Sequence, residues 1–149
     1  MENKIKVFEN KQVRTSWNAE EEEWYFSVVD VVAVLTDSVN PTDYLKKMRK
    51  RDPELNTYIG TNCPQVEMRG DSGKKRKVLA ASTKGVLRIV QSIPSPKAEP
   101  FKMWLAQVGS ERLDDIADPE KAILRGAEFY RAKGYTEGWI NQRLQTIEM

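Results

Sequence analysis

Residues 24–35 read WYFSVVDVVAVL, and they decide the fold because a strand pattern and a helix pattern meet within them. Trp24 to Phe26 are aromatic, which is typical of a short strand. The valines that follow also favour a strand, but Ser27 with Asp30 three residues later resembles the capping box that begins a helix. We therefore predict a helix over residues 28–35 that is apolar on nearly all sides and lies in the core.

Two hairpins are expected on either side of this helix. Before it, residues 5–8 and 13–17 alternate apolar and polar side chains around a polar link, and residues 24–26 can add a third strand to this sheet. After it, residues 66–69 and 77–80 flank a glycine-bounded basic loop, which is typical of a second hairpin. The sequence therefore predicts a small antiparallel sheet.

The remainder of the chain is predicted to be helical. Helix starts are expected where a capping side chain precedes an apolar-periodic stretch, at Asn40, Ser82, Ser95 and Asp118. The helix after Asn40 should run to about Arg51, and glycines should end helices at Gly109-Ser110 and at Gly134. We expect an α+β fold of small antiparallel hairpins packed with several helices, with a winged helix-turn-helix-like core and a helical C-terminal third.

We expect one domain over residues 1–117 and a helical extension over residues 118–149. No helix-ending residue follows the last apolar stripe, so we expect the helix to continue beyond Met149 in the natural protein. The chain has no apolar run near 20 residues and no secretory signal pattern, and we expect a cytoplasmic protein without a membrane partner.

Composition removes most familiar catalytic chemistry. The 149 residues include no histidine and one cysteine, which excludes an intrachain disulfide, the common zinc sites and a Ser-His-Asp triad. Glu9 and Lys11 form only a fragment of a nuclease motif, and the acids of residues 114–120 lack the spacing of a calcium loop. We expect a protein that is not an enzyme and that needs no metal or cofactor.

Charge is unevenly distributed along the chain. Residues 41–97 carry 13 Lys/Arg and 5 Asp/Glu, a net charge of +8, whereas residues 1–40 and 98–149 carry net charges of −4 and −2. A concentrated positive region attracts polyanions more strongly than scattered charges do. Within this basic region, the helix after Asn40 has Tyr44, Leu45 and Met48 on one face and cations on the remaining arc of about 200°.

This helix and the basic hairpin loop predict a surface for duplex DNA. In a winged-helix arrangement the helix lies in the major groove and the loop follows the phosphates. The predicted DNA-binding residues are the exposed cations of these two elements: Lys46, Lys47, Arg49, Lys50, Arg51, Lys74, Lys75, Arg76 and Lys77. Simple solvation of both faces is the alternative, and nothing in the helix supports recognition of a base sequence.

A protein-interaction domain is the alternative function. The last helix has an apolar stripe of four residues that would be large for a short terminal helix to leave exposed: Trp139, Ile140, Leu144 and Ile147. Through this stripe the chain would form a homo-oligomer, or titrate a repressor or another protein without binding DNA itself. The two functions are compatible, because DNA-binding domains are commonly dimeric.

The sequence also resembles a known family. The residues that carry this resemblance are residues 24–35, Asn40, residues 85–89, Ser92, Ala98, Phe101 and Trp104. Over about residues 5–116 the chain is similar to the N-terminal domain of the BRO family, found in prophage antirepressors and large DNA viruses. Its tail looks like that of prophage antirepressors and damage-inducible protein D-like members. The resemblance implies a small α+β DNA-binding domain in a phage-derived regulator of transcription or of the DNA damage response, without catalytic residues.

Overall fold

The computed structural model describes residues 13–70 and 72–147. The chain divides into two compact units, an N-terminal unit that ends at Met103 and a C-terminal unit that begins at Trp104. The boundary between residues 117 and 118 that the sequence indicates stays a prediction. Among the described residues, no helix combines the length and apolar character needed to cross a membrane.

The N-terminal unit contains a four-stranded antiparallel sheet with the strand order β1-β2-β4-β3. Its strands are β1 (Thr15–Asn18), β2 (Glu23–Ser27), β3 (Gln65–Arg69) and β4 (Lys75–Ser82). The pairs β1–β2 and β3–β4 confirm the strands predicted around residues 15–17, 24–26, 66–69 and 77–80. The strand predicted over residues 5–8 lies outside the described residues.

Helix α1 (Val28–Thr36) follows β2 without a connecting loop, as the sequence predicts. The Ser27 hydroxyl accepts a hydrogen bond from the Asp30 backbone N–H, and this cap changes the chain from strand to helix. The apolar side chains of Val28, Val31 and Val32 are at most 1% exposed. Helix capping and burial together therefore override the strand propensity of the valines.

Helices α2 (Pro41–Arg51) and α3 (Pro53–Asn62) follow in sequence. The prediction of α2 with Asn40 as its N-cap is confirmed, whereas α3 was not predicted. Helix α3 begins with the same chemistry as α2, because Asp52 caps the Leu55 N–H at 3.0 Å and Pro53 occupies the first turn. The Leu55 and Ile59 side chains of α3 are fully buried, which makes this helix part of the core.

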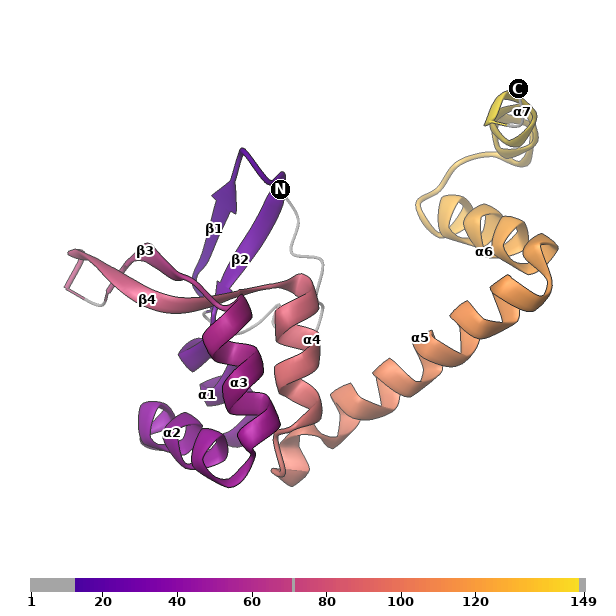
Figure 1. Ribbon diagram of the computed structural model, residues 1–149. Helices are drawn as coiled ribbons and strands as arrows, with labels where there is room; N and C mark the ends of the chain where they lie inside the picture. The colour runs from indigo at the N-terminus through magenta and orange to yellow at the C-terminus, as the bar shows by residue number, and fades with distance from the viewer. Residues whose placement is uncertain (1–12, 71, 148–149) are drawn as a thin grey trace. The chain divides into compact units, whose positions relative to one another are not determined.

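Helix α4 (Thr83–Gln91) begins at the predicted cap, where Ser82 accepts a hydrogen bond from the Gly85 N–H. In Figure 1, α2, α3 and α4 lie below strands β3 and β4. The tip of the β3–β4 hairpin and helix α2 both lie toward the left of the N-terminal unit, and α4 lies on the other side of α3 (Figure 1). In this view the two predicted basic elements lie toward the same side of the N-terminal unit.

The last part of the chain is helical: a short 3-10 turn, η2 (Pro96–Ala98), precedes α5 (Glu99–Ala117), α6 (Pro119–Ala132) and α7 (Glu137–Ile147). The end of α6 at Gly134 is confirmed by the positive φ of 92° at this glycine. The helix end predicted at Gly109-Ser110 is wrong, because α5 continues through both residues. A glycine inside a helix costs only about 1 kcal/mol, and it keeps its backbone N–H. The fold is α+β, as predicted.

Candidate nucleic-acid interface

A groove of about 670 Å³ lies between helices α1, α2 and α3 and the base of the β3–β4 hairpin. Its lining comes from all five elements: Val29, Thr42, Leu45, Lys46, Arg49, Lys50, Asn56, Gln65 and Leu79. Apolar side chains of α1, α2 and β4 are combined here with the polar side chains of Thr42, Asn56 and Gln65. The groove thus joins the basic helix to the hairpin.

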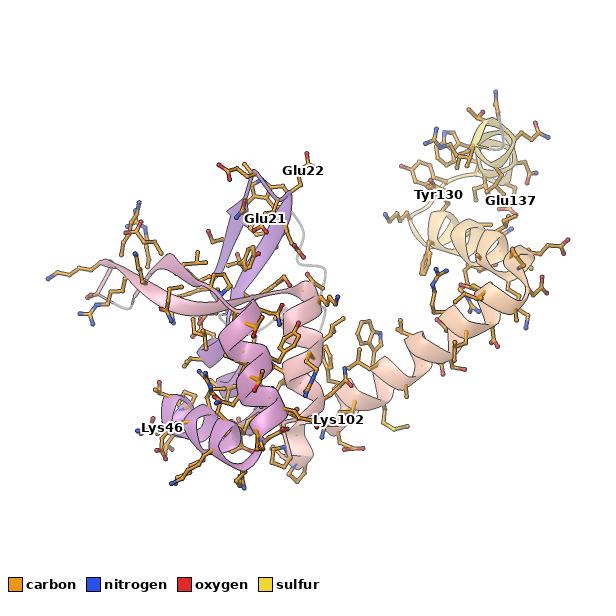
Figure 2. All side chains as sticks on the ribbon, in the orientation of Figure 1. Glu21, Glu22, Lys46, Lys102, Tyr130 and Glu137 are labelled. Carbon is orange, nitrogen blue, oxygen red and sulfur yellow. The ribbon has the colours of Figure 1, made fainter. Side chains whose placement is uncertain are left out.

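Helix α2 presents only part of its cationic arc to this groove. Its Leu45 and Met48 side chains are at most 5% exposed, so this face packs on the core. Lys46, Arg49 and Lys50 line the groove, and Figure 2 labels Lys46 on α2. Lys47 and Arg51 are not among the residues that line the groove; they lie farther around the helix by about 100° and 140° from Lys46.

Two side-chain contacts distinguish the cations of α2. The Arg49 Nε donates a hydrogen bond of 2.7 Å to the Asn56 Oδ1 and thereby fixes α2 to α3. The Lys47 Nζ pairs with the Asp43 carboxylate at 3.1 Å on an exposed surface. No ion pair with a described carboxylate involves Lys46 or Lys50, so both ammonium groups are available to an anion.

The register of the hairpin shows which of its cations face the groove. Residues directly opposite each other on antiparallel strands point to the same face, and the face alternates from one pair to the next. The pairs on the groove face are Gln65 with Leu79, Glu67 with Lys77, and Arg69 with Lys75. Lys75 and Lys77 therefore lie on the same strand face as Leu79, farther along β4, and Lys75 lines a second pocket with Arg14, Thr15 and Ser16.

Arg76 lies on the other face of the hairpin, opposite Met68. Met68 belongs to a buried cluster with Tyr25 and Ala80, against which Val66 and Val78 pack. Lys74 is exposed next to the hairpin tip. Of the nine predicted DNA-binding residues, the structure brings together Lys46, Arg49 and Lys50 in the groove. Lys75 and Lys77 lie on the strand face of Leu79 but outside the groove, Lys74 lies at the tip, and Lys47, Arg51 and Arg76 lie away from the groove.

An ion pair holds the hairpin to α1. The Arg14 Nε donates to the Asp30 Oδ2 at 2.7 Å, and the Nη2 donates to the Oδ1 at 3.1 Å. The Arg14 Nη1 also donates to the Arg69 carbonyl oxygen at 3.2 Å, at the end of β3. The guanidinium thus links β1, α1 and β3, and it restricts where the basic hairpin lies relative to α2.

Sequence reasoning missed several of these residues. Asn56 was missed because α3 was not predicted, although Asp52-Pro53 repeats the helix-start signal of Asn40-Pro41. The Arg14–Asp30 pair joins residues 16 apart in the chain, and no local pattern reports such a contact.

The predicted stripe on α7 is not uniformly exposed. Ile140 is 1% exposed and therefore buried within the chain itself, because α7 packs on α6. Trp139 is 40% exposed and stacks on the Tyr135 ring, with a centroid distance of 4.2 Å. Leu144 is half-buried and Ile147 is exposed. A role for these four residues at an interface stays a prediction. Ile140 is buried, so it would not contact a partner directly and would only support the exposed residues around it.

Other candidate residues have structural roles. Burial raises the pKa of the half-buried Cys63 thiol, which keeps it protonated near neutral pH. Asp118 caps α6, and Asp115 accepts a hydrogen bond of 3.0 Å from the Arg125 Nε. Within residues 13–70 and 72–147, no three His, Cys, Asp or Glu side chains are placed to hold a metal ion. Glu9 and Lys11 lie outside the described residues.

Comparison with known proteins places this chain in a family. The model of the BRO family N-terminal domain matches residues 12–111. The chain belongs to the BRO family. The match covers all of the groove and the hairpin, and the BRO domain is associated with antirepressor-like regulatory proteins of phages. No curated protein and no solved structure matches the sequence.

Proposed function

We propose that this chain is the DNA-binding regulatory module of a phage- or prophage-derived antirepressor-like protein. It binds duplex DNA in the cytoplasm through phosphate contacts, and it carries out no catalysis and requires no cofactor. The observation that supports this proposal is the groove that joins Lys46 and Lys50 of α2 to Gln65 and Leu79 at the base of the basic hairpin, whose strand face continues to Lys77 and Lys75. Membership of the BRO family agrees with it.

The dimensions of this surface suit a duplex. Lys75 lies four positions from Leu79 along β4, a distance of about 13 Å in an extended strand. The major groove of DNA is about 12 Å wide, and we expect the cations of α2 and those of the hairpin to contact phosphates on its two sides. Contacts of this kind position the protein and add no preference for a base sequence.

The salt dependence of binding tests the mechanism. If four to six cations neutralise phosphates, log affinity falls with log salt concentration at a slope of about −4 to −5. We would measure retention of a duplex, a single strand and an RNA of equal length on filters at several ionic strengths. Preference for the duplex supports the proposal, whereas equal retention of all three polyanions contradicts it.

Two charge-reversal variants on the same helix test the position of the site. Lys46→Glu/Lys50→Glu changes the groove side, and Lys47→Glu/Arg51→Glu changes the net charge equally on the outer side. Loss of two phosphate contacts should weaken binding about 100-fold at 0.1 M salt and reduce the slope by about 2. We expect less than a tenfold loss for the outer pair.

Equal losses in the two variants would show that net charge, rather than the groove, determines binding. Circular dichroism of both variants is the control for folding, because all four side chains lie on the surface or line an open groove. If the wild-type chain retained no DNA at low salt, the alternative function would replace this one: a protein-interaction domain that titrates a repressor or another partner.

A further inference from the structure

Helix α5 has an apolar face that the C-terminal unit leaves uncovered. From Trp104 to Ala117 no residue of this helix is buried. The Val108, Leu113 and Ile116 side chains are 40%, 69% and 62% exposed. An isolated helix of about 14 residues is marginal in water, because most helical stability in proteins comes from packing of an apolar face. Packing of this stretch against another surface would therefore stabilise it.

Helix α6 does not cover this face. Arg125 of α6 reaches Asp115 at 3.0 Å and Glu111 at 3.6 Å, and these contacts hold the two helices together. On a helical wheel, Glu111 and Asp115 lie about 90° to 130° from the centre of the apolar stripe. The centre of the stripe therefore lies about a quarter turn or more from the side of α5 that Arg125 contacts.

The apolar residues of α5 are arranged symmetrically along the helix. Leu105 and Ile116 lie at equal distances from the midpoint between Ser110 and Glu111, and so do Val108 and Leu113. A two-fold interface requires one patch that is complementary to itself. An antiparallel pair of α5 helices, with the two-fold axis at this midpoint, brings each Leu105 against Ile116 of the other copy and each Val108 against Leu113.

The same symmetry pairs Gly109 with Arg112, close to the axis. A Cβ added at Gly109 would meet no atom within 4 Å in the single chain, so the fold of one copy does not require glycine there. Arg112 is exposed and forms no ion pair with a described carboxylate. In the antiparallel pair, the missing side chain at Gly109 gives space to Arg112 of the other copy.

We propose that two copies of this chain associate through α5 as an antiparallel helix pair. A pair of this length buries roughly 1,000 Å² in total, the lower end for a specific interface, and we expect a dissociation constant in the micromolar range. The charge distribution favours association of two copies through this part of the chain. Residues 98–149 have a net charge of only −2, so two copies repel each other little there. The basic regions of two copies, residues 41–97 with a net charge of +8 each, would repel each other.

Molar mass as a function of concentration tests the association. Light scattering of the whole chain from about 1 to 200 µM should show a rise from 17.1 kDa toward twice this mass. Leu113→Asp/Ile116→Asp should keep the lower mass throughout. The matched control is Phe129→Asp on α6, which is 66% exposed but not on the stripe, and it should associate like the wild type.

Disulfide trapping tests the antiparallel register. In a Cys63→Ser background, Leu105→Cys/Ile116→Cys should form a covalent dimer on mild oxidation. The two sites are about 16 Å apart within one helix, too far for a disulfide inside one copy. Leu105→Cys alone should remain unlinked, because the two copies of residue 105 are also about 16 Å apart.

A covalent dimer from Leu105→Cys alone would overturn the antiparallel register. A wild-type chain that keeps the single-chain mass at every concentration, or a Leu113→Asp/Ile116→Asp variant that still associates, would overturn the interface. These outcomes are distinguishable from failure of DNA binding, because the measurements contain no DNA and the changed residues lie outside the groove.

Discussion

The two compact units differ in where their apolar residues lie. Every described apolar residue that is buried belongs to the N-terminal unit, except Ala127 and Ile140. The exposed large apolar side chains show the reverse distribution, because most of them belong to the C-terminal unit. The N-terminal unit therefore has a core of its own, whereas the C-terminal unit exposes much of the surface that could form one.

Surface contacts replace a core in the C-terminal unit. The rings of Tyr130, Tyr135 and Trp139 pack against one another, with centroid distances of 4.2 to 5.5 Å. The Arg131 Nε pairs with the Glu137 carboxylate at 2.8 Å and links α6 to α7, and Figure 2 labels Tyr130 and Glu137 in this unit. Contacts of this kind stabilise less than burial does, which suits a unit that completes its packing with a second copy.

The largest effect should come from truncating one buried side chain in each unit. We expect Leu55→Ala in α3 to lower the free energy of unfolding of the N-terminal unit by about 3 kcal/mol, because it leaves a cavity in a closed core. Ile140→Ala should speed amide hydrogen exchange in α7 and leave the N-terminal unit unchanged. Urea unfolding and hydrogen exchange measure the two effects.

Thr57→Ala is the matched control for Leu55→Ala, since Thr57 lies on the same helix and is exposed. It should change the free energy of unfolding by less than about 0.5 kcal/mol. If Ile140→Ala destabilised the N-terminal unit as strongly as Leu55→Ala does, the two units would share one core and the comparison between them would fail.

An intermediate effect should come from removing one ion pair in each unit. The Asp30 side chain is 16% exposed and that of Arg14 is 33% exposed, and the guanidinium also contacts Arg69. Asp30→Asn should cost about 2 kcal/mol, because it leaves a partly buried guanidinium without its counter-charge. Glu137→Gln should have a much smaller effect on urea unfolding at neutral pH, since the Arg131–Glu137 pair is exposed.

Asp30→Asn should also weaken DNA binding, because the Arg14 guanidinium holds the basic hairpin to α1. The matched control is Asp43→Asn, which removes the exposed ion pair with Lys47 and should leave the hairpin in place. A double-mutant cycle with Arg14→Gln isolates the interaction of Arg14 with Asp30. A coupling energy near zero would contradict the role of this pair.

The N-terminal unit was largely predictable where the signal is local. The caps at Ser27, Asn40 and Ser82 gave correct helix starts, because a capping side chain bonds to a backbone N–H only two or three residues away. The basic face of α2 was also predictable, because helical periodicity within this one segment determines which residues share a face. The prediction failed at Asp52-Pro53, where the end of one helix is also the start of the next.

The non-local features could not be predicted from the sequence. The groove depends on packing of α3 and the hairpin base beside α2, and the Arg14–Asp30 pair joins distant segments. The apolar periodicity of α7 indicated one apolar stripe, but periodicity does not show whether the chain itself or a partner covers each of its residues. Ile140 is covered by the chain, whereas Ile116 of α5 is not.

The smallest effect should be a pH dependence of opposite sign in the two units. A hydrogen bond of 2.8 Å to Glu21, together with burial, raises the pKa of Tyr25 to about 12. This contribution to the N-terminal unit is complete below the ordinary pKa of 10 and is lost as the pH rises toward 12. The hydrogen bond from Arg131 lowers the pKa of Glu137, so its contribution to the C-terminal unit is lost as the pH falls below 4.5.

Differences between each variant and the wild type isolate these two groups from all others that titrate. Tyr25→Phe should reduce the loss of stability of the N-terminal unit between pH 10 and 12. Glu137→Gln should reduce the loss of stability of α7 as the pH falls below 4.5. Each variant should leave the other unit unchanged, because Tyr25 belongs to the N-terminal unit and Glu137 to the C-terminal unit. If Tyr25→Phe kept the full alkaline loss, groups other than this phenol would determine it, and the hydrogen bond to Glu21 would contribute little to the stability of the sheet.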